Sequence, residues 1–147
     1  MVLDDDVIER AAAALHDRSV GASAPAPRYA ELPDAEREKS RDGARAIPAL
    51  LEQLGVDLVP AAEGDGSVLS PEERERAAML EHDRWAAFTR GLGYEHGAER
   101  DDVALRHPDL VPWEQLDEAT RDKDRERIRI IEELVVELGL GLRRSGP

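Results

Sequence analysis

The sequence contains no cysteine, and aromatic residues make up only 3% of it. Without cysteine the chain can form neither disulfide bonds nor thiolate zinc sites, and nothing indicates an oxidising compartment. With so few aromatic residues, the core must be built mainly from Leu, Ile, Val and Ala. No hydrophobic run approaches the roughly 20 residues that a helix needs to cross a bilayer, and the acidic N-terminus is unlike a signal peptide. We therefore expect a cytoplasmic protein without membrane contact.

Basic residues are also scarce, since 20 Lys and Arg face 33 Asp and Glu and the formal net charge is −13. A protein that binds DNA or RNA needs a basic face to neutralise phosphates, so we expect no nucleic-acid partner. The abundance of Ala, Leu and charged residues favours helix. A chain of 147 residues is long enough for one domain or one pair of small fused units.

The chain contains an internal repeat. Residues 9–18 and 75–84 share the pattern Glu-Arg-Ala-Ala-x-x-x-His-Asp-Arg at the same spacing. A second pattern of Leu, Arg, Ile and Gly positions in 32–55 recurs in 116–139 at a larger offset, which indicates an insertion in the later copy. Because the His-Asp-Arg triplet and the final Leu and Gly keep their register, we interpret the chain as a duplication.

Each copy is predicted to be a pair of helices joined by a connector. The first copy has apolar residues at helical spacing in 7–19 and 33–54, where Pro48 should bend or break the second helix. The second copy has helices over about 71–90 and 117–138.

The ends of these helices are marked by particular residues. Ser70-Pro71-Glu72-Glu73 is a capping box with proline at the first helical position, and Asp117 is expected to cap the last helix. Gly55 and Gly139 are helix stop signals. The Gly-, Ala-, Ser- and Pro-rich segment 21–27 is a loop.

These features together predict a mainly α fold of two tandem helix-pair repeats in a pseudo-twofold arrangement. Short β-strands are expected in the second connector, within 94–113, because the residues before its prolines are extended. The first repeat spans 1–60, the linker 61–70, and the second repeat 71–147.

The second copy carries the motifs that point to a family. They are His82-Asp83-Arg84-Trp85, a Gly/Tyr loop, Arg100-Asp101-Asp102, His107-Pro108-Asp109-Leu110-Val111-Pro112-Trp113 and Asp124-Arg125. Together they resemble the ryanodine receptor repeat (RyR domain) in its bacterial form, with two copies in tandem and the first degenerate. The resemblance implies a non-catalytic module that binds a purine-nucleotide-type ligand by stacking on the tryptophan of the first motif, here Trp85.

Two positions depart from the pattern of the family. Ser19 stands where the first copy would carry that tryptophan, and Leu92 replaces the tryptophan of the glycine loop in the second copy. One indole face, that of Trp85, therefore remains for a ligand.

The candidate ligand-binding site consists of seven residues, which are His82, Arg84, Trp85, Tyr94, Arg100, His107 and Trp113. A tryptophan face can stack on any base, and a guanidinium can grip a phosphate through two parallel hydrogen bonds. Imidazole and phenol groups can bond to the edge of the ligand ring. One stack and a few polar contacts predict an affinity on the order of micromolar.

We expect neither a cofactor, a metal site nor catalysis. The spacing of the histidines and aspartates matches no compact ligand motif for zinc. The chain also lacks a cysteine nucleophile, a Gly-x-Ser-x-Gly elbow and a phosphate-cradling glycine loop before a helix.

The same residues also permit purely structural roles. Trp85 and Phe88 belong to a helical stripe of the kind that usually packs in a core. His82 recurs as His16, which favours a hydrogen bond from each histidine to its connector. His107, which precedes a proline, can cap a turn.

Two further features have structural interpretations. Trp113 falls opposite Tyr29 and can act as a hydrophobic plug before a helix, and the charged run 121–129 is typical of a solvated helix face. The alternative function is therefore an acidic protein–protein interaction scaffold that docks a basic partner and has no small-molecule ligand. A hydrolase is the third possibility.

Overall fold

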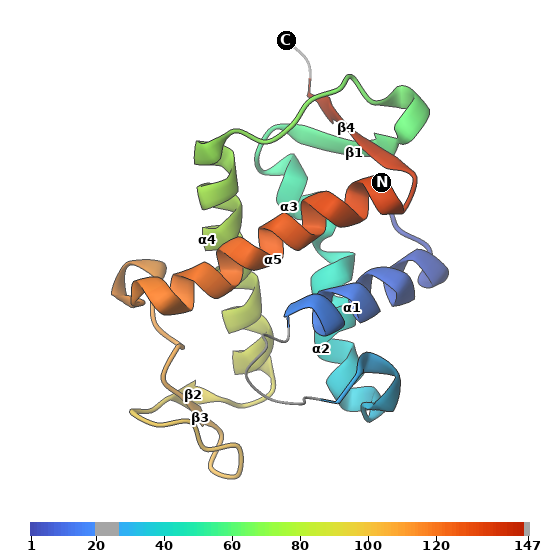
Figure 1. Cartoon of the computed structure of the whole chain (residues 1–147). Coiled ribbons are helices and arrows are strands. Elements are labelled where there is room, and N and C mark those ends of the chain that lie inside the picture. Colours follow the sequence, from blue (N-terminus) through green and yellow to red (C-terminus); the bar gives the residue numbers. More distant parts are fainter. Residues whose placement is uncertain (20–26, 146–147) are drawn as a thin grey trace.

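The protein is described by a computed structural model that covers residues 1–19 and 27–145. It confirms the mainly α prediction (Figure 1). The helices are α1 (Asp5–Ser19), α2 (Asp34–Arg45), α3 (Ile47–Glu52), α4 (Pro71–Gly91) and α5 (Glu118–Glu137). Single 3-10 turns occur at η1 (Tyr29–Glu31), η2 (Ala61–Glu63) and η3 (Trp113–Gln115). Most of the loop predicted at 21–27 lies outside the described residues.

The predicted helix ends are confirmed by their hydrogen bonds. The Ser70 hydroxyl accepts a bond of 3.1 Å from the Glu73 amide, and the Glu73 carboxylate accepts one of 2.8 Å from the Ser70 amide. Asp117 accepts a bond of 2.8 Å from the Thr120 amide at the start of α5. These bonds satisfy amides that have no partner within the helix.

The break expected near Pro48 is present between α2 and α3. Helix α2 ends at Arg45, and Ala46 separates it from α3, in which Pro48 occupies the first turn. A proline fits there because it has no N–H to donate. The helix that the sequence predicted over 33–54 is therefore two helices.

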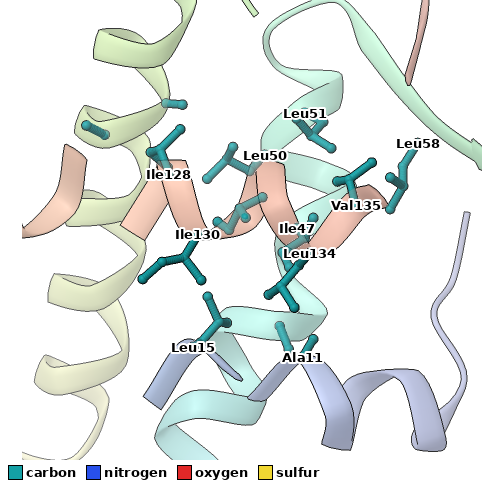
Figure 2. Packing of buried hydrophobic residues seen from close by; sticks show 14 of the residues in the cluster. Ala11, Leu15, Ile47, Leu50, Leu51, Leu58, Ile128, Ile130, Leu134 and Val135 are labelled. Atoms are coloured by element: carbon teal, nitrogen blue, oxygen red, sulfur yellow. The ribbon is translucent and has the colours of Figure 1, made fainter. Parts of the chain in front are cut away.

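The core is a single cluster to which both halves of the chain contribute. Figure 2 shows side chains of α5 meeting those of α1, α3 and strand β1 (Val56–Pro60). The labelled residues are Ala11, Leu15, Ile47, Leu50, Leu51, Leu58, Ile128, Ile130, Leu134 and Val135. Leu, Ile, Val and Ala dominate the cluster, as the composition predicted.

The two aromatic residues that precede helices also belong to this core. Tyr29 and Trp113 are buried and open the turns η1 and η3, respectively. The plug interpretation of Trp113 is therefore confirmed.

Two small sheets complete the fold. β2 (Glu95–His96) pairs in parallel with β3 (Arg106–His107), which confirms short strands within 94–113. β1 pairs antiparallel with β4 (Leu140–Arg144), with Leu58 opposite Leu142. The sequence did not predict this second sheet, because β1 and β4 are too short to show a strand pattern and lie far apart in the chain. The first turn of the segment 61–70, predicted as a linker, is η2, which follows β1 directly.

Candidate functional site

A cleft of about 620 Å³ lies among α4, α5 and α2. Four of the seven predicted site residues line it, namely His82, Arg84, Trp85 and His107. The α4 residues that face the cleft recur every three or four positions, from Glu81 to Phe88, and so form one stripe of the helix. The cleft therefore takes its aromatic side from a single face of α4.

The aromatic wall of the cleft is centred on Trp85. The Trp85 indole stacks against the His82 ring at 5.7 Å between centroids and an interplanar angle of 27°. The His107 ring meets the indole edge-on at 4.8 Å and 73°. Trp85 is only partly buried, so one part of the indole packs on the protein and another part faces the cleft.

The two histidines of the wall, His82 and His107, differ in which ring nitrogen is bonded to the protein. His82 is buried, and its Nε2 lies 2.7 Å from the Val111 carbonyl oxygen. Since a carbonyl only accepts, Nε2 carries the hydrogen. The predicted bond from His82 to the connector is thus present, and the same bond joins His16 to the Pro27 oxygen at 2.8 Å.

His107 presents a donor toward the cleft. Its Nδ1 accepts a hydrogen bond of 3.1 Å from the Asp109 amide, which is the predicted turn cap. Burial lowers the pKa of the His107 imidazole, so the ring is neutral at pH 7 and its hydrogen is on Nε2. This N–H can donate to an acceptor on the edge of a bound ring.

The floor of the cleft is a buried ion-pair cluster around Glu81. Arg84 binds both oxygens of this carboxylate, at 2.9 Å from Nε and 2.8 Å from Nη2, and its Nη1 lies 2.6 Å from Asp42. Each nitrogen of the Arg84 guanidinium thus has a carboxylate partner. The sequence proposed Arg84 as a phosphate ligand, but the structure gives its donors protein partners.

Arg127 and Asp124 also face the cleft, and sequence reasoning missed both. The solvated-face interpretation of 121–129 is wrong for these two residues, whose side chains are only 19% and 18% exposed. Arg127 Nε lies 3.1 Å from Glu81 Oε1. A signal was available, because Asp124 and Arg127 continue the apolar stripe of α5 by one helical turn toward its start.

Burial changes the titration of both groups. It raises the pKa of the Asp124 carboxyl to about 6, with a further contribution from the neighbouring Glu81. Burial also lowers the pKa of the Arg127 guanidinium. Both shifts favour the uncharged form, as expected where burial keeps water away from the charged groups.

The remaining three predicted residues do not line the cleft. Tyr94 and Arg100 both bind Asp102, at 3.0 Å and 3.1 Å, on the exposed loop that carries β2 and β3. Trp113 is in the core, and the guanidinium groups of Arg121 and Arg125 lie 5.6 Å and 5.7 Å from the centre of its ring.

The described residues also bear on metal binding and membrane insertion. Within 1–19 and 27–145, no group of three or more His, Asp or Glu side chains is arranged to hold a metal ion. No helix in this part of the chain is long and apolar enough to cross a membrane. The chemistry that the cleft supports is the binding of a flat ring against Trp85 with polar contacts on its edge.

Comparison with protein-family models identifies a family for the second half of the chain. The family model described as the RyR domain matches residues 71–144, from the start of α4 to the end of β4. The matched segment is half of the chain and contains most of the residues that line the cleft. No curated protein matches the sequence.

Proposed function

This chain belongs to the RyR domain family, and from that premise we propose that it is a non-catalytic module that binds a nucleotide-like small molecule in the cleft beside Trp85. The observation that carries the proposal is the position of Trp85, whose indole forms the wall of a cleft of about 620 Å³ with His107 against its edge. An indole enclosed in the core would have favoured a scaffold. A volume of this size is ordinary for small-molecule sites.

The polar groups at this wall suit a heteroaromatic ring. The free N–H of His107 can donate to a ring nitrogen or carbonyl, and Phe88 adds apolar surface beside the indole. Stacking on an aromatic side chain is worth about 1–3 kcal/mol per base and tolerates every base. A purine-type ligand bound with an affinity on the order of micromolar fits this set of contacts.

The proposal is tested by a panel of adenine and guanine nucleosides and nucleotides in a thermal-shift assay, followed by calorimetry. At least one ligand should raise the melting temperature, because a ligand of the native state stabilises it by mass action. Trp85→Ala should weaken binding by about 5- to 100-fold. Tyr94→Ala is the matched control, since Tyr94 is an aromatic residue outside the cleft, and should bind like the wild type.

A negative panel would favour the alternative. If no member shifts the melting temperature at millimolar concentration and Trp85→Ala only lowers stability, the ligand-binding proposal fails. The acidic scaffold without a small-molecule ligand would then be preferred.

We also infer that the chain is a tandem pair of RyR-type repeats, with residues 1–60 as a degenerate first copy. Matched contacts support this inference. His16 and His82, which correspond in the sequence, each place Nε2 within 2.8 Å of a connector carbonyl oxygen, Pro27 in one copy and Val111 in the other. In both copies the histidine thereby ties the connector to the first helix.

Two further correspondences support the duplication. Glu9 of α1 binds Arg41 of α2, as Glu75 of α4 binds Arg125 of α5. At the centre of the β1–β4 pair, Leu58 lies opposite Leu142. These two residues occupy the same position in the two proposed repeats. An antiparallel pair centred on equivalent residues is what a local twofold axis requires.

A further inference from the structure

We infer that Arg127 is the anion-binding residue of the cleft and that it takes an anionic group of the ligand, such as a phosphate, with Lys123 and Lys39 at the rim. This inference rests on the proposed function and assigns a chemical class to the second half of the ligand. It differs from the sequence prediction, which gave this role to Arg84 or Arg100.

The first observation is that Arg127 has unused donors. Its Nε is buried without a hydrogen-bond partner among the described residues, although it lies 3.1 Å from Glu81 Oε1. At this distance the bond is missing because the N–H does not point at the carboxylate oxygen. A guanidinium cannot lose its proton in a protein, and an unsatisfied buried donor costs free energy. The two Nη nitrogens form no hydrogen bond with the described residues either, and they are the donors that an anion in the cleft would meet.

The second observation is that Arg127 is held in place. Its Nε lies against Glu81 of α4, and its Nη2 lies against Gly43 of α2. A Cβ atom at Gly43 would be 2.9 Å from Arg127 Nη2, which is closer than carbon atoms normally approach. The glycine thus makes room for the guanidinium between the two helices. A forked donor that is already positioned loses little freedom when it binds an anion.

The third observation concerns the acidic groups at the rim. Asp122 and Glu126 line the cleft, but each is bound by an arginine of α5, Arg125 and Arg129 respectively. Lys123 also lines the cleft and forms no ion pair within residues 1–19 and 27–145, and Lys39 reaches the opposite rim from α2. The electrostatic repulsion of an anion by the rim is therefore reduced.

Three further acids line the cleft, namely Glu81, which Arg84 binds, Asp109, which lies near His107, and Asp124. Of these, Asp124 couples anion binding to pH. It is surrounded by Glu81, His82 and Arg84 of α4 and by Arg127 of its own helix, and its pKa is raised to about 6. An anion beside Asp124 repels the carboxylate and favours the protonated acid, so binding takes up a proton. Anion binding should therefore strengthen as pH falls through about 6.

The test compares two probes by calorimetry, adenosine and the monomethyl ester of adenosine 5′-phosphate. The ester carries one negative charge throughout the experiment, at about pH 5.5 and about pH 8, so the ligand itself does not titrate. The intact protein should bind the ester about 10- to 100-fold more tightly than adenosine at the lower pH, as expected for hydrogen bonds between charged groups. The preference should be smaller at the higher pH.

Three variants separate the contributions. Arg127→Gln should abolish the preference for the ester over adenosine. Arg127→Lys, which keeps the charge but lacks the fork, should retain only part of the preference. Asp124→Asn should make the preference independent of pH. Arg76→Gln is the control, because Arg76 is an exposed arginine of α4 that does not line the cleft, and it should keep the preference.

Each alternative result has a definite meaning. Equal affinity for the two probes in the intact protein would overturn the anion subsite, and so would equal losses of the preference in Arg127→Gln and Arg76→Gln. In either case adenosine binding would still support the stacking site. Failure of both probes to bind would overturn the proposed function and the subsite together. If Arg127→Gln does not fold, Arg127→Lys decides the outcome.

Discussion

At the scale of single residues, neighbours determine what each side chain can do. Arg84 and Arg127 are both arginines beside Glu81. Each nitrogen of the Arg84 guanidinium binds a carboxylate, whereas Arg127 forms no hydrogen bond with the described residues. The two histidines of the wall differ in the same way, since His82 spends its N–H on the Val111 carbonyl. From residue type alone, both arginines would have been given the same role, and so would both histidines.

Asp124 should make the stability of the fold depend on pH. Its pKa is raised from 3.8 to about 6, so the folded state binds the proton more tightly than the unfolded state. The associated stability, about 3 kcal/mol, is present below pH 4 and is lost as pH rises through about 6. Asp124→Asn should therefore raise the free energy of unfolding by about 1–3 kcal/mol at pH 8 and have little effect near pH 4.

Urea unfolding of the variant across this pH range measures the effect. Asp122→Asn is the control, because Asp122 is on the same helix but is exposed and paired with Arg125. If Asp124→Asn raised the free energy of unfolding by the same amount at pH 4 and at pH 8, the stabilisation would not come from removing a buried charge.

At the scale of elements, helix ends follow from short motifs and strand pairing does not. The capping box at Ser70 and the break near Pro48 depend on residues within one or two turns, so the sequence reveals them. The pairing of β1 with β4 joins a segment near the middle of the chain to one near its C-terminal end. It is decided by the way in which α5 crosses the other helices, and no local pattern encodes that.

The cap of α4 gives a prediction at this scale. Ser70→Ala removes the acceptor for the Glu73 amide and should lower the free energy of unfolding by about 1 kcal/mol. Ser70→Gly should lower the free energy of unfolding by only a few tenths of a kcal/mol, because water can then reach the Glu73 amide. Urea denaturation measures both, and the midpoint should move without a change in slope. Equal losses for Ala and Gly would contradict the cap.

At the scale of the whole molecule, the two halves of the chain share one core and one cleft. α5 packs against α1 as well as α4, and β1 pairs with β4. Lys39 and Ser40 of α2 line the cleft whose aromatic wall is on α4. The family match over 71–144 therefore covers the wall of the site and leaves out part of its rim.

We accordingly expect neither 1–70 nor 71–147 to fold alone. Each fragment would expose the apolar face that the other covers, and burial of that face is the main source of stability. Circular dichroism of the separate fragments should show little helix and no cooperative melting, and an equimolar mixture should regain both. A cooperative transition for 71–147 by itself would contradict the shared core.

The sequence by itself determined the mainly α fold, the helix ends, the strands of the second connector and the bonds from His16 and His82. These depend on contacts within a few residues, or on a bond that two copies of one pattern repeat. Only the tertiary structure decided which charges enter the cleft. It brought Arg127 in and left Arg100 outside, because that choice depends on where α2, α4 and α5 cross, which is set by packing between residues far apart in the chain.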